Sequence, residues 1–235
     1  MKKLDSVDWF KYWEQKADEG ELSTMDRSGY SIREFLIYIN SINKAFKGVS
    51  YDDVILDIGG GAGYTSLAFQ PFVKQMYLAD FSAKMIKRAR SEKSKIDKTV
   101  MYQDSLPDII YTKEKKIKFS KIIIGSVIQY LNDYEEIACA FDNLFDVLKQ
   151  EGVIILTHIP DFEKKDSFIK SFQKLDWPIN KIESAVQHET NERFWLNFDT
   201  LSELSTKAGF SKCEKKSIPG ELFQSTHMFD MVLIK

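Results

Sequence analysis

Short apolar, β-rich runs alternate with segments of helical period along most of this 235-residue chain, and this alternation limits the fold more than any other feature. The runs are VILDIG (54–59), QMYLAD (75–80), TVMYQD (99–104), KIIIGSV (121–127) and GVIILTHI (152–159). The stretches between them are mostly long enough for a crossover helix, so the strands are expected to be parallel. Because a parallel sheet is covered on both faces, the alternation predicts a doubly wound α/β fold.

The remaining segments divide the chain, which we interpret as a single domain over 1–235, into recognisable parts. Residues 1–50 contain two apparent helices, and residues 160–198 are expected to form a small, helical cap inserted after the fifth strand. Residues 199–235 predict a helix followed by two strands, at 210–218 and 227–235. The link between these two strands is too short for a crossover helix, so they are expected to be antiparallel.

Local signals mark where three of the helices begin and end. Ser82 is a candidate N-cap for a helix over 82–95, and Gly152 is expected to end a helix over 133–152. For the helix in 198–210 the expected cap is Asp199 or Thr200, and the expected stop is Gly209.

Composition excludes several classes of protein. Apolar residues make up 43% and charged residues 29%, which is typical of a globular protein with a full core. The net charge of −2 offers no basic excess for nucleic acid. Cys139 and Cys213 have neither metal-site nor disulfide spacing, and no apolar run approaches the ~20 residues of a membrane span. We expect a cytoplasmic protein without metal, nucleic-acid or membrane partners, either a monomer or a homodimer.

Glycines at positions 59, 60, 61 and 63 follow Asp57 at the end of the first run. Neither Gly59 nor Gly61 starts a complete dinucleotide-binding fingerprint, and the Gly-Lys-Ser/Thr ending of a P-loop is missing. Glycine lets a ligand lie against bare backbone, and the acid suits a cationic group such as that of an amino acid. The alternative is a glycine turn that serves packing alone, although ligands of open α/β sheets bind beyond the carboxyl ends of the strands.

Two further acids end the next two runs. Asp80 could accept hydrogen bonds from both hydroxyls of a ribose, or it could cap the following helix, a role that Ser82 could also fill. Asp104 could accept from an exocyclic amine such as that of adenine, or it could form a turn. The three acids together, one for an amine, one for a ribose and one for a nucleobase, favour a bound nucleoside more strongly than any of them does alone.

These segments resemble the motifs of class I S-adenosylmethionine-dependent methyltransferases. In the order of that family the chain carries VILDIGGGAG, YLADFSAKMIKRAR, MYQDSLP, FSKIIIGSVIQYL and LKQEGVIILT followed by AGF, which together span about 54 to 210. Gly60 stands where many members have Cys or another small residue. The resemblance implies a Rossmann-like, seven-stranded, mostly parallel sheet with the last strand antiparallel, N-terminal lid helices, and a cofactor-binding half over 51–159.

The resemblance also implies S-adenosyl-L-methionine as the cofactor and S-adenosyl-L-homocysteine as the product. By position, Asp57, Gly59 and Gly61 would hold the methionine moiety, Asp80 the ribose, and Phe81 would pack on adenine. The other contacts that the resemblance implies come from Asp104 and Ser105 at the adenine edge and from Tyr12, Tyr30, Met85, Leu106, Ser126 and Gln129 around the rest of the cofactor.

The acceptor carries no motif of its own. A hydroxyl acceptor would use a general base, for which His158 and His188 are the candidates, with His227 a weaker one. Each histidine also has a purely structural alternative. The expected cap and lid favour an enclosed small molecule, possible acceptors being a sugar or sugar nucleotide methylated on a hydroxyl or amine. The alternatives are a non-catalytic S-adenosylmethionine-binding module, and an aminopropyltransferase or nicotinamide oxidoreductase on the same fold.

Overall fold

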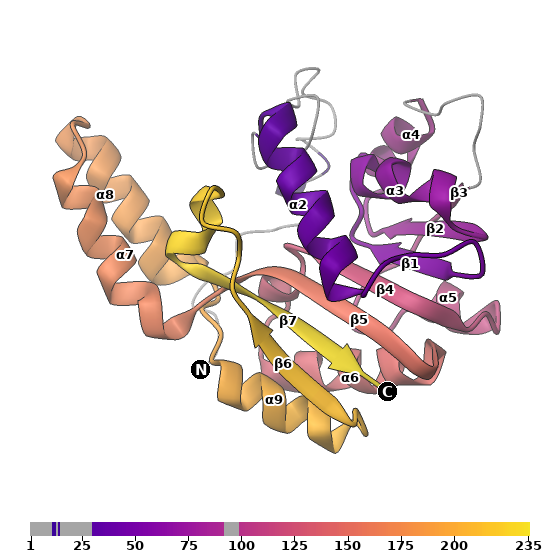
Figure 1. Cartoon of the computed structure of the whole chain (residues 1–235). Helices are drawn as coiled ribbons and strands as arrows, with labels where there is room; N and C mark the ends of the chain where they lie inside the picture. Colours follow the sequence, from indigo (N-terminus) through magenta and orange to yellow (C-terminus); the bar gives the residue numbers. More distant parts are fainter. Residues whose placement is uncertain (1–10, 13, 15–29, 92–98) are drawn as a thin grey trace.

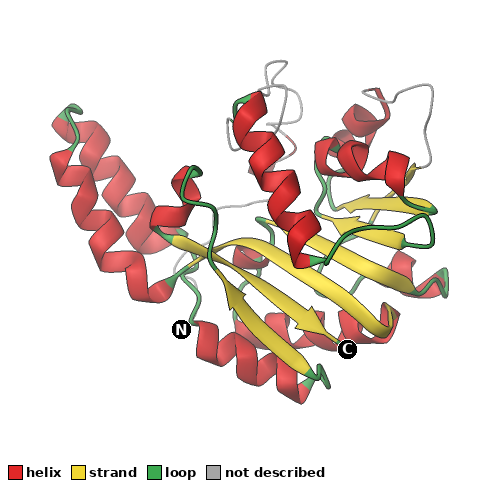
Figure 2. Ribbon diagram, in the orientation of Figure 1, coloured by secondary structure: helices red, strands yellow, loops and turns green. Residues whose placement is uncertain are grey.

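The computed structural model describes residues 11–12, 14, 30–91 and 99–235. Its centre is one sheet with the strand order β3-β2-β1-β4-β5-β7-β6 (Figures 1 and 2). The strands are β1 (Val54–Ile58), β2 (Gln75–Asp80), β3 (Thr99–Gln103), β4 (Phe119–Gly125), β5 (Leu148–Pro160), β6 (Lys212–Lys216) and β7 (Met228–Ile234). β7 is antiparallel to both β5 and β6, and the other neighbours are parallel. The predicted seven-stranded fold is confirmed.

Helices cover both faces of this sheet (Figure 1). One face carries α2 (Ile32–Ala45), α3 (Tyr64–Phe69) and α4 (Ala83–Ser91). The other carries α5 (Ile110–Glu114), α6 (Tyr134–Val147) and α9 (Phe198–Lys207). Within the described residues, none of the helices has both the length and the apolar character needed to cross a membrane.

The apolar run of β4 shows how the two faces are filled. Ile122 and Ile124 pack in the core that contains Phe141 of α6, whereas Ile123 packs in the core that contains Ile42 of α2. All of these side chains are at most 1% exposed. Burying such a side chain contributes about 1.5–3 kcal/mol, so both faces of the strand stabilise the fold.

Two of the predicted helix ends are confirmed and two are wrong. Ser82 caps α4, because its Oγ accepts a hydrogen bond from the Met85 amide at 3.1 Å. Gly209, with φ +102°, follows the last turn of α9. However, α6 ends at Val147 rather than near Gly152, because β5 already begins at Leu148. The cap of α9 is Asn197, whose side chain accepts from the Thr200 amide, and not Asp199 or Thr200.

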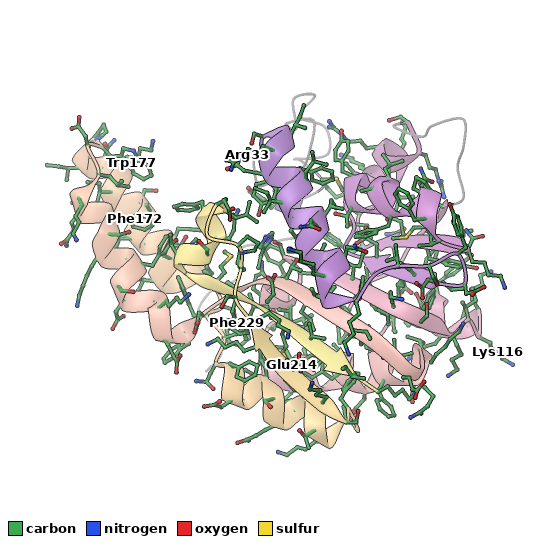
Figure 3. The ribbon with its side chains drawn as sticks, viewed as in Figure 1. Arg33, Lys116, Phe172, Trp177, Glu214 and Phe229 are labelled. Carbon is green, nitrogen blue, oxygen red and sulfur yellow. The ribbon has the colours of Figure 1, made fainter. Side chains whose placement is uncertain are left out.

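The segment expected to form a cap holds two helices, α7 (Lys165–Ser171) and α8 (Ile179–Gln187), which project beyond the end of β5 (Figure 1). Phe168, Phe172 and Trp195 form a small core of their own. Figure 3 shows Phe172 and Trp177 on this hairpin, and their rings stack with centroids 6.3 Å apart. Of the expected N-terminal lid, α2 is present with Ser31 as its cap, whereas most of the first expected helix lies outside the described residues.

Candidate functional site

The glycine turn after β1 depends on glycine for two different reasons. Gly59 has φ +71°, and a Cβ there would lie 2.2 Å from Cγ2 of Val127, so any side chain would clash. Gly61 has φ +55°, but among the described residues no heavy atom outside its chain neighbours lies within 4 Å of the position that its Cβ would take. The first glycine therefore allows close packing against the loop after β4, and the second leaves open space beside a left-handed backbone.

Asp80, at the end of β2, bonds to this turn. Its Oδ2 accepts from the Gly61 amide at 2.9 Å and its Oδ1 accepts from the Ser82 amide at 2.9 Å. The side chain is 4% exposed. Because Ser82 caps α4 with its own hydroxyl, Asp80 is not needed as the side-chain cap, and its carboxylate links the glycine turn to the first turn of α4.

Asp57 lies buried beneath the same turn. Its Oδ2 accepts from the Ser66 hydroxyl at 2.8 Å. Burial, together with the neighbouring negative charge of Asp80 and against the effect of the Ser66 hydrogen bond, raises the pKa of Asp57 to about 7. A cation bound nearby would favour the ionised form of this carboxylate.

Asp104, after β3, makes bonds that the turn alternative predicts. Its Oδ2 accepts from the Thr112 amide at 2.8 Å and from the Thr112 hydroxyl at 2.6 Å. Its Oδ1 accepts from the Ser105 amide at 3.1 Å. The carboxylate thus fastens the loop after β3 to α5, and its contact with adenine stays a prediction.

The remaining candidates on the adenosine side differ in exposure. Met85 is 1% exposed and Leu106 is 9% exposed, so both belong to the buried interior. Phe81 is half-buried, and its carbonyl accepts from Nε2 of Gln103 at 2.8 Å. Their contacts with a cofactor stay predictions.

The loop after β4 contributes a buried polar atom without a partner. Gln129 is 8% exposed, and its Oε1 has no hydrogen-bond partner among the described atoms. A buried polar group left unsatisfied costs about 1–3 kcal/mol. A ligand with a donor group would satisfy it. The residues at this edge of the sheet therefore fit a polar cofactor.

His158 joins the ends of β4 and β5 to the beginning of α2. Its Nε2 lies 2.9 Å from the Tyr30 hydroxyl and its Nδ1 lies 3.1 Å from the Ser126 hydroxyl. The ring is 4% exposed, and burial lowers the pKa of His158 to about 4. A base with so low a pKa has little driving force to take a proton at neutral pH. The low pKa therefore weighs against His158 as a general base.

The other two histidines lie by the cap. His188 is half-buried at the end of α8. His227 stacks on Phe168 with centroids 3.8 Å apart, and its Nδ1 lies 2.8 Å from the Thr226 hydroxyl. Burial, followed by the positive charges of Arg193 and Lys164, lowers the pKa of His227 to about 3. His227 therefore has structural contacts, although it precedes β7, an interior strand, and does not hydrogen-bond on an edge strand as expected.

Two polar neighbours of the candidate residues were missing from the sequence analysis. Asp230 of β7 accepts from the His158 amide at 2.9 Å, and its only local signal is an acid inside the apolar run MFDMVLI. Glu14 accepts from the Ser82 hydroxyl and lies 3.9 Å from the Lys84 ammonium group. Tyr12, two residues before Glu14, is 39% exposed, and its contact with the cofactor stays a prediction. Among the described residues, no group of three or more His, Cys, Asp or Glu side chains could hold a metal ion.

Comparison with known proteins gives a consistent result. A family model described as "Methyltransferase domain" matches residues 50–226. The uncharacterized methyltransferase YcgJ of Bacillus subtilis (strain 168) is 27% identical over 135 residues, which are 56% of this chain and 51% of that protein. The chain thus spans about half the length of this curated relative.

Solved structures share the fold at low sequence identity. The N-methyltransferase NodS from Bradyrhizobium japonicum WM9, in complex with S-adenosyl-L-homocysteine, gives a TM-score of 0.63 at 14% identity and covers 97% of this chain and 99% of its own. The magnesium protoporphyrin IX methyltransferase ChlM from Synechocystis PCC 6803 gives 0.62 at 12% identity and covers 97% and 94%. The family model matches most of the chain, and the seven-stranded sheet has the fold of the methyltransferase structures named above. The chain therefore belongs to the class I S-adenosylmethionine-dependent methyltransferases.

Proposed function

We propose that this protein transfers a methyl group from S-adenosylmethionine to a hydroxyl or amine of a small molecule. The observation that carries the proposal is the 2.9 Å bond between the Asp80 carboxylate and the Gly61 amide, which joins the glycine turn and the acid of the second strand into one unit. The cofactor supplies an already activated methyl group on a sulfonium. The residues of the chain then have to bind the cofactor, orient the acceptor toward its methyl group and exclude water from the site.

Each part of the carboxyl edge has a proposed role in binding. Gly59 and Gly61 give the cofactor access to bare backbone, and Asp80 accepts from the ribose hydroxyls. Gln129 offers a side-chain oxygen that has no partner among the described residues, and Asp57 would be ionised more fully by the cationic end of the cofactor. The other proposed contacts are the ones named by position, namely Tyr12, Tyr30, Phe81, Met85, Asp104, Ser105, Leu106 and Ser126.

For the acceptor we propose a small molecule, such as a sugar or sugar nucleotide. The support is positional: Tyr30 at the start of α2 and the hairpin of α7 and α8 both adjoin the end of β5. Tyr30 bonds His158 there, and the backbone of Leu196 returns from the hairpin to bond Pro160 at 2.9 Å. For a hydroxyl acceptor, His158 and His188 stay the candidate bases, with the low pKa of His158 favouring His188 or no base.

Calorimetric titration with S-adenosylhomocysteine tests the binding unit. Asp80→Asn should weaken affinity by about 10- to 100-fold, because hydrogen bonds to a charged acceptor contribute about 1.5–3 kcal/mol. Asp142→Asn, an equal change of charge at an exposed position of α6, is the matched control. Unchanged affinity in Asp80→Asn would remove the ribose assignment, and no binding by the wild-type protein would refute the proposed function.

Transfer itself is tested with a labelled methyl group and a panel of sugars, sugar nucleotides, amines and phenols. Methylation of at least one compound is expected. Tight cofactor binding with transfer to none of them would favour the non-catalytic alternative. Preference for decarboxylated S-adenosylmethionine would favour the aminopropyltransferase.

A further inference from the structure

The end of β5 is bulged, and the bulge sets the direction of His158. Leu156 pairs with Met231 and Ile159 pairs with Phe229, so Thr157 and His158 together face the single residue Asp230. His158 has φ +57°, a left-handed conformation that is uncommon for residues other than glycine and that one class of bulge uses. Two residues opposite one interrupt the ordinary alternation of side chains along the strand.

As a result, Thr157 and His158 both reach α2. The Thr157 hydroxyl lies 3.0 Å from the Tyr38 hydroxyl, and the His158 ring stacks on the Tyr38 ring with centroids 4.9 Å apart. In a regular strand, successive side chains point to opposite faces. The bulge therefore brings the imidazole to the face that carries Tyr30.

Asp230 satisfies the backbone donor that the bulge leaves without a ladder partner. Its Oδ1 accepts from the His158 amide at 2.9 Å, and the side chain is 3% exposed. A buried amide without an acceptor would destabilise the fold. The bond from Asp230 removes this penalty and so stabilises the bulge and the position of the ring.

The imidazole then connects two segments that lie far apart in the sequence. Its two ring nitrogens lie within hydrogen-bond distance of the Tyr30 and Ser126 hydroxyls. Ser126 itself has φ +57°. The next residue, Val127, packs so closely on Gly59 that a Cβ added at Gly59 would clash with it. A neutral imidazole has one donor and one acceptor, which is what a bridge between two hydroxyls requires.

We propose that His158 is a positioning residue of the cofactor site, whose neutral ring holds Ser126 and the loop after β4 against the glycine turn and holds Tyr30 at the same edge of the sheet. The inference rests on the proposed function, because it assigns the consequence to cofactor binding. Asp230 supports the ring through the backbone of the bulge.

The test is a double-mutant cycle on the affinity for S-adenosylhomocysteine, measured by calorimetry. Tyr30→Phe removes one hydroxyl. His158→Asn keeps a side chain that tolerates positive φ and can reach Ser126, but it is too short for Tyr30. Each single variant should raise the dissociation constant about 3- to 10-fold, the double variant should add little, and His158→Ala should bind more weakly than His158→Asn.

Tyr38→Phe is the matched control, because it removes an equivalent buried hydroxyl from α2. It should bind S-adenosylhomocysteine like the wild-type protein, since the Tyr38 hydroxyl bonds Thr157 and phenylalanine keeps the ring that stacks on His158. If the wild-type protein binds and all variants bind equally well, the positioning role is refuted while the proposed function stands. If the wild-type protein does not bind, the proposed function fails first.

Nitrogen-15 NMR of the labelled histidine ring gives a second readout that does not depend on affinity. The His158 nitrogens should show a neutral ring with unchanged shifts between about pH 5 and 8, in contrast to an ordinary histidine with a midpoint near about 6.5. A titration of His158 within that range would overturn the bridge and return His158 to the candidates for a general base.

Discussion

Asp57 near the end of β1 and Asp80 at the end of the neighbouring β2 fix successive parts of the chain that follows β1: Asp80 accepts from the Gly61 amide of the glycine turn at 2.9 Å, and Asp57 accepts from the Ser66 hydroxyl of α3 at 2.8 Å. The mutual repulsion of the two carboxylates adds to burial in raising the pKa of Asp57 to about 7. This pair therefore carries a charge that depends on pH in the neutral range.

The pair predicts that cofactor binding releases protons. A cationic ligand favours ionised Asp57, so affinity for S-adenosylmethionine should rise with pH up to about 8, and binding near pH 7 should release a fraction of one proton. Calorimetry in two buffers of different ionisation enthalpy measures this release. S-adenosylhomocysteine, which lacks the sulfonium charge, should release less.

Asp57→Asn is the variant for this prediction, because the amide can still accept from Ser66. It should abolish the release of protons. Equal binding enthalpies in the two buffers for the wild-type protein would contradict the linkage.

The contact between Gly59 and Val127 predicts that a side chain at position 59 destabilises the fold, and that a smaller residue at position 127 reduces this loss. Gly59→Ala should lower the free energy of unfolding by about 2–4 kcal/mol, through left-handed strain and overpacking against Val127. Adding Val127→Ala removes the clashing methyl group and should restore part of the loss. Urea unfolding measures both effects.

Gly220→Ala is the control for this pair, since a Cβ at that position would meet no atom within 4 Å in the part of the chain that the structure describes. Its stability should stay within about 0.5 kcal/mol of the wild-type value. If Val127→Ala and Gly59→Ala destabilise additively, the close contact does not account for the loss.

Asp230 predicts a pH-dependent difference in stability. Burial raises the pKa of Asp230 to about 7, above the value of about 3.9 in an unfolded chain. The native state then binds more protons than the unfolded state between these values, so the contribution of Asp230 to stability falls as pH rises from about 4 to 7. Asp230→Asn, which keeps an acceptor for the His158 amide, should be more stable than the wild-type protein at about pH 8.

The gain should shrink toward about pH 4, where Asp230 is protonated in the wild-type native state. Melting temperatures over this range measure it, at roughly 2–4 °C for each kcal/mol in a chain of this size. A wild-type protein that is the more stable of the two at about pH 8 would contradict the prediction.

A buried ion pair at the opposite edge of the sheet gives a prediction independent of the cofactor. Lys121 of β4 lies 2.6 Å from Asp53, and their side chains are 13% and 8% exposed. Burial alone would raise the pKa of Asp53, but hydrogen bonds from Lys121, Ser120 and Ser50 outweigh it and lower the pKa. Lys121→Met should destabilise the fold by about 3 kcal/mol, because it leaves a buried carboxylate without its cation.

Lys149→Met, at an exposed lysine, is the matched control for Lys121→Met. Chemical denaturation should show little change in it. In Asp53→Asn the further substitution Lys121→Met should cost much less than in the wild-type protein, and equal costs in both backgrounds would contradict the coupling.

The sequence alone determined the architecture and the edge of the sheet where the cofactor is proposed to bind. The alternation of apolar runs with helical periods predicts parallel strands, and the short link before β7 predicts its antiparallel direction. Ser82 and Gly209 also carry signals that the structure confirms, because capping depends on neighbours within a few residues.

The tertiary structure alone decided which partners the polar side chains have. Asp104 bonds Thr112, and His158 bonds Tyr30 and Ser126 with its ring and Asp230 with its backbone. Asp230 lies 72 residues away from His158 in the chain, and the bulge that joins them exists only in the pairing of β5 with β7. Periodicity reports which face of an element is buried, whereas a hydrogen bond depends on where distant elements bring their donors and acceptors.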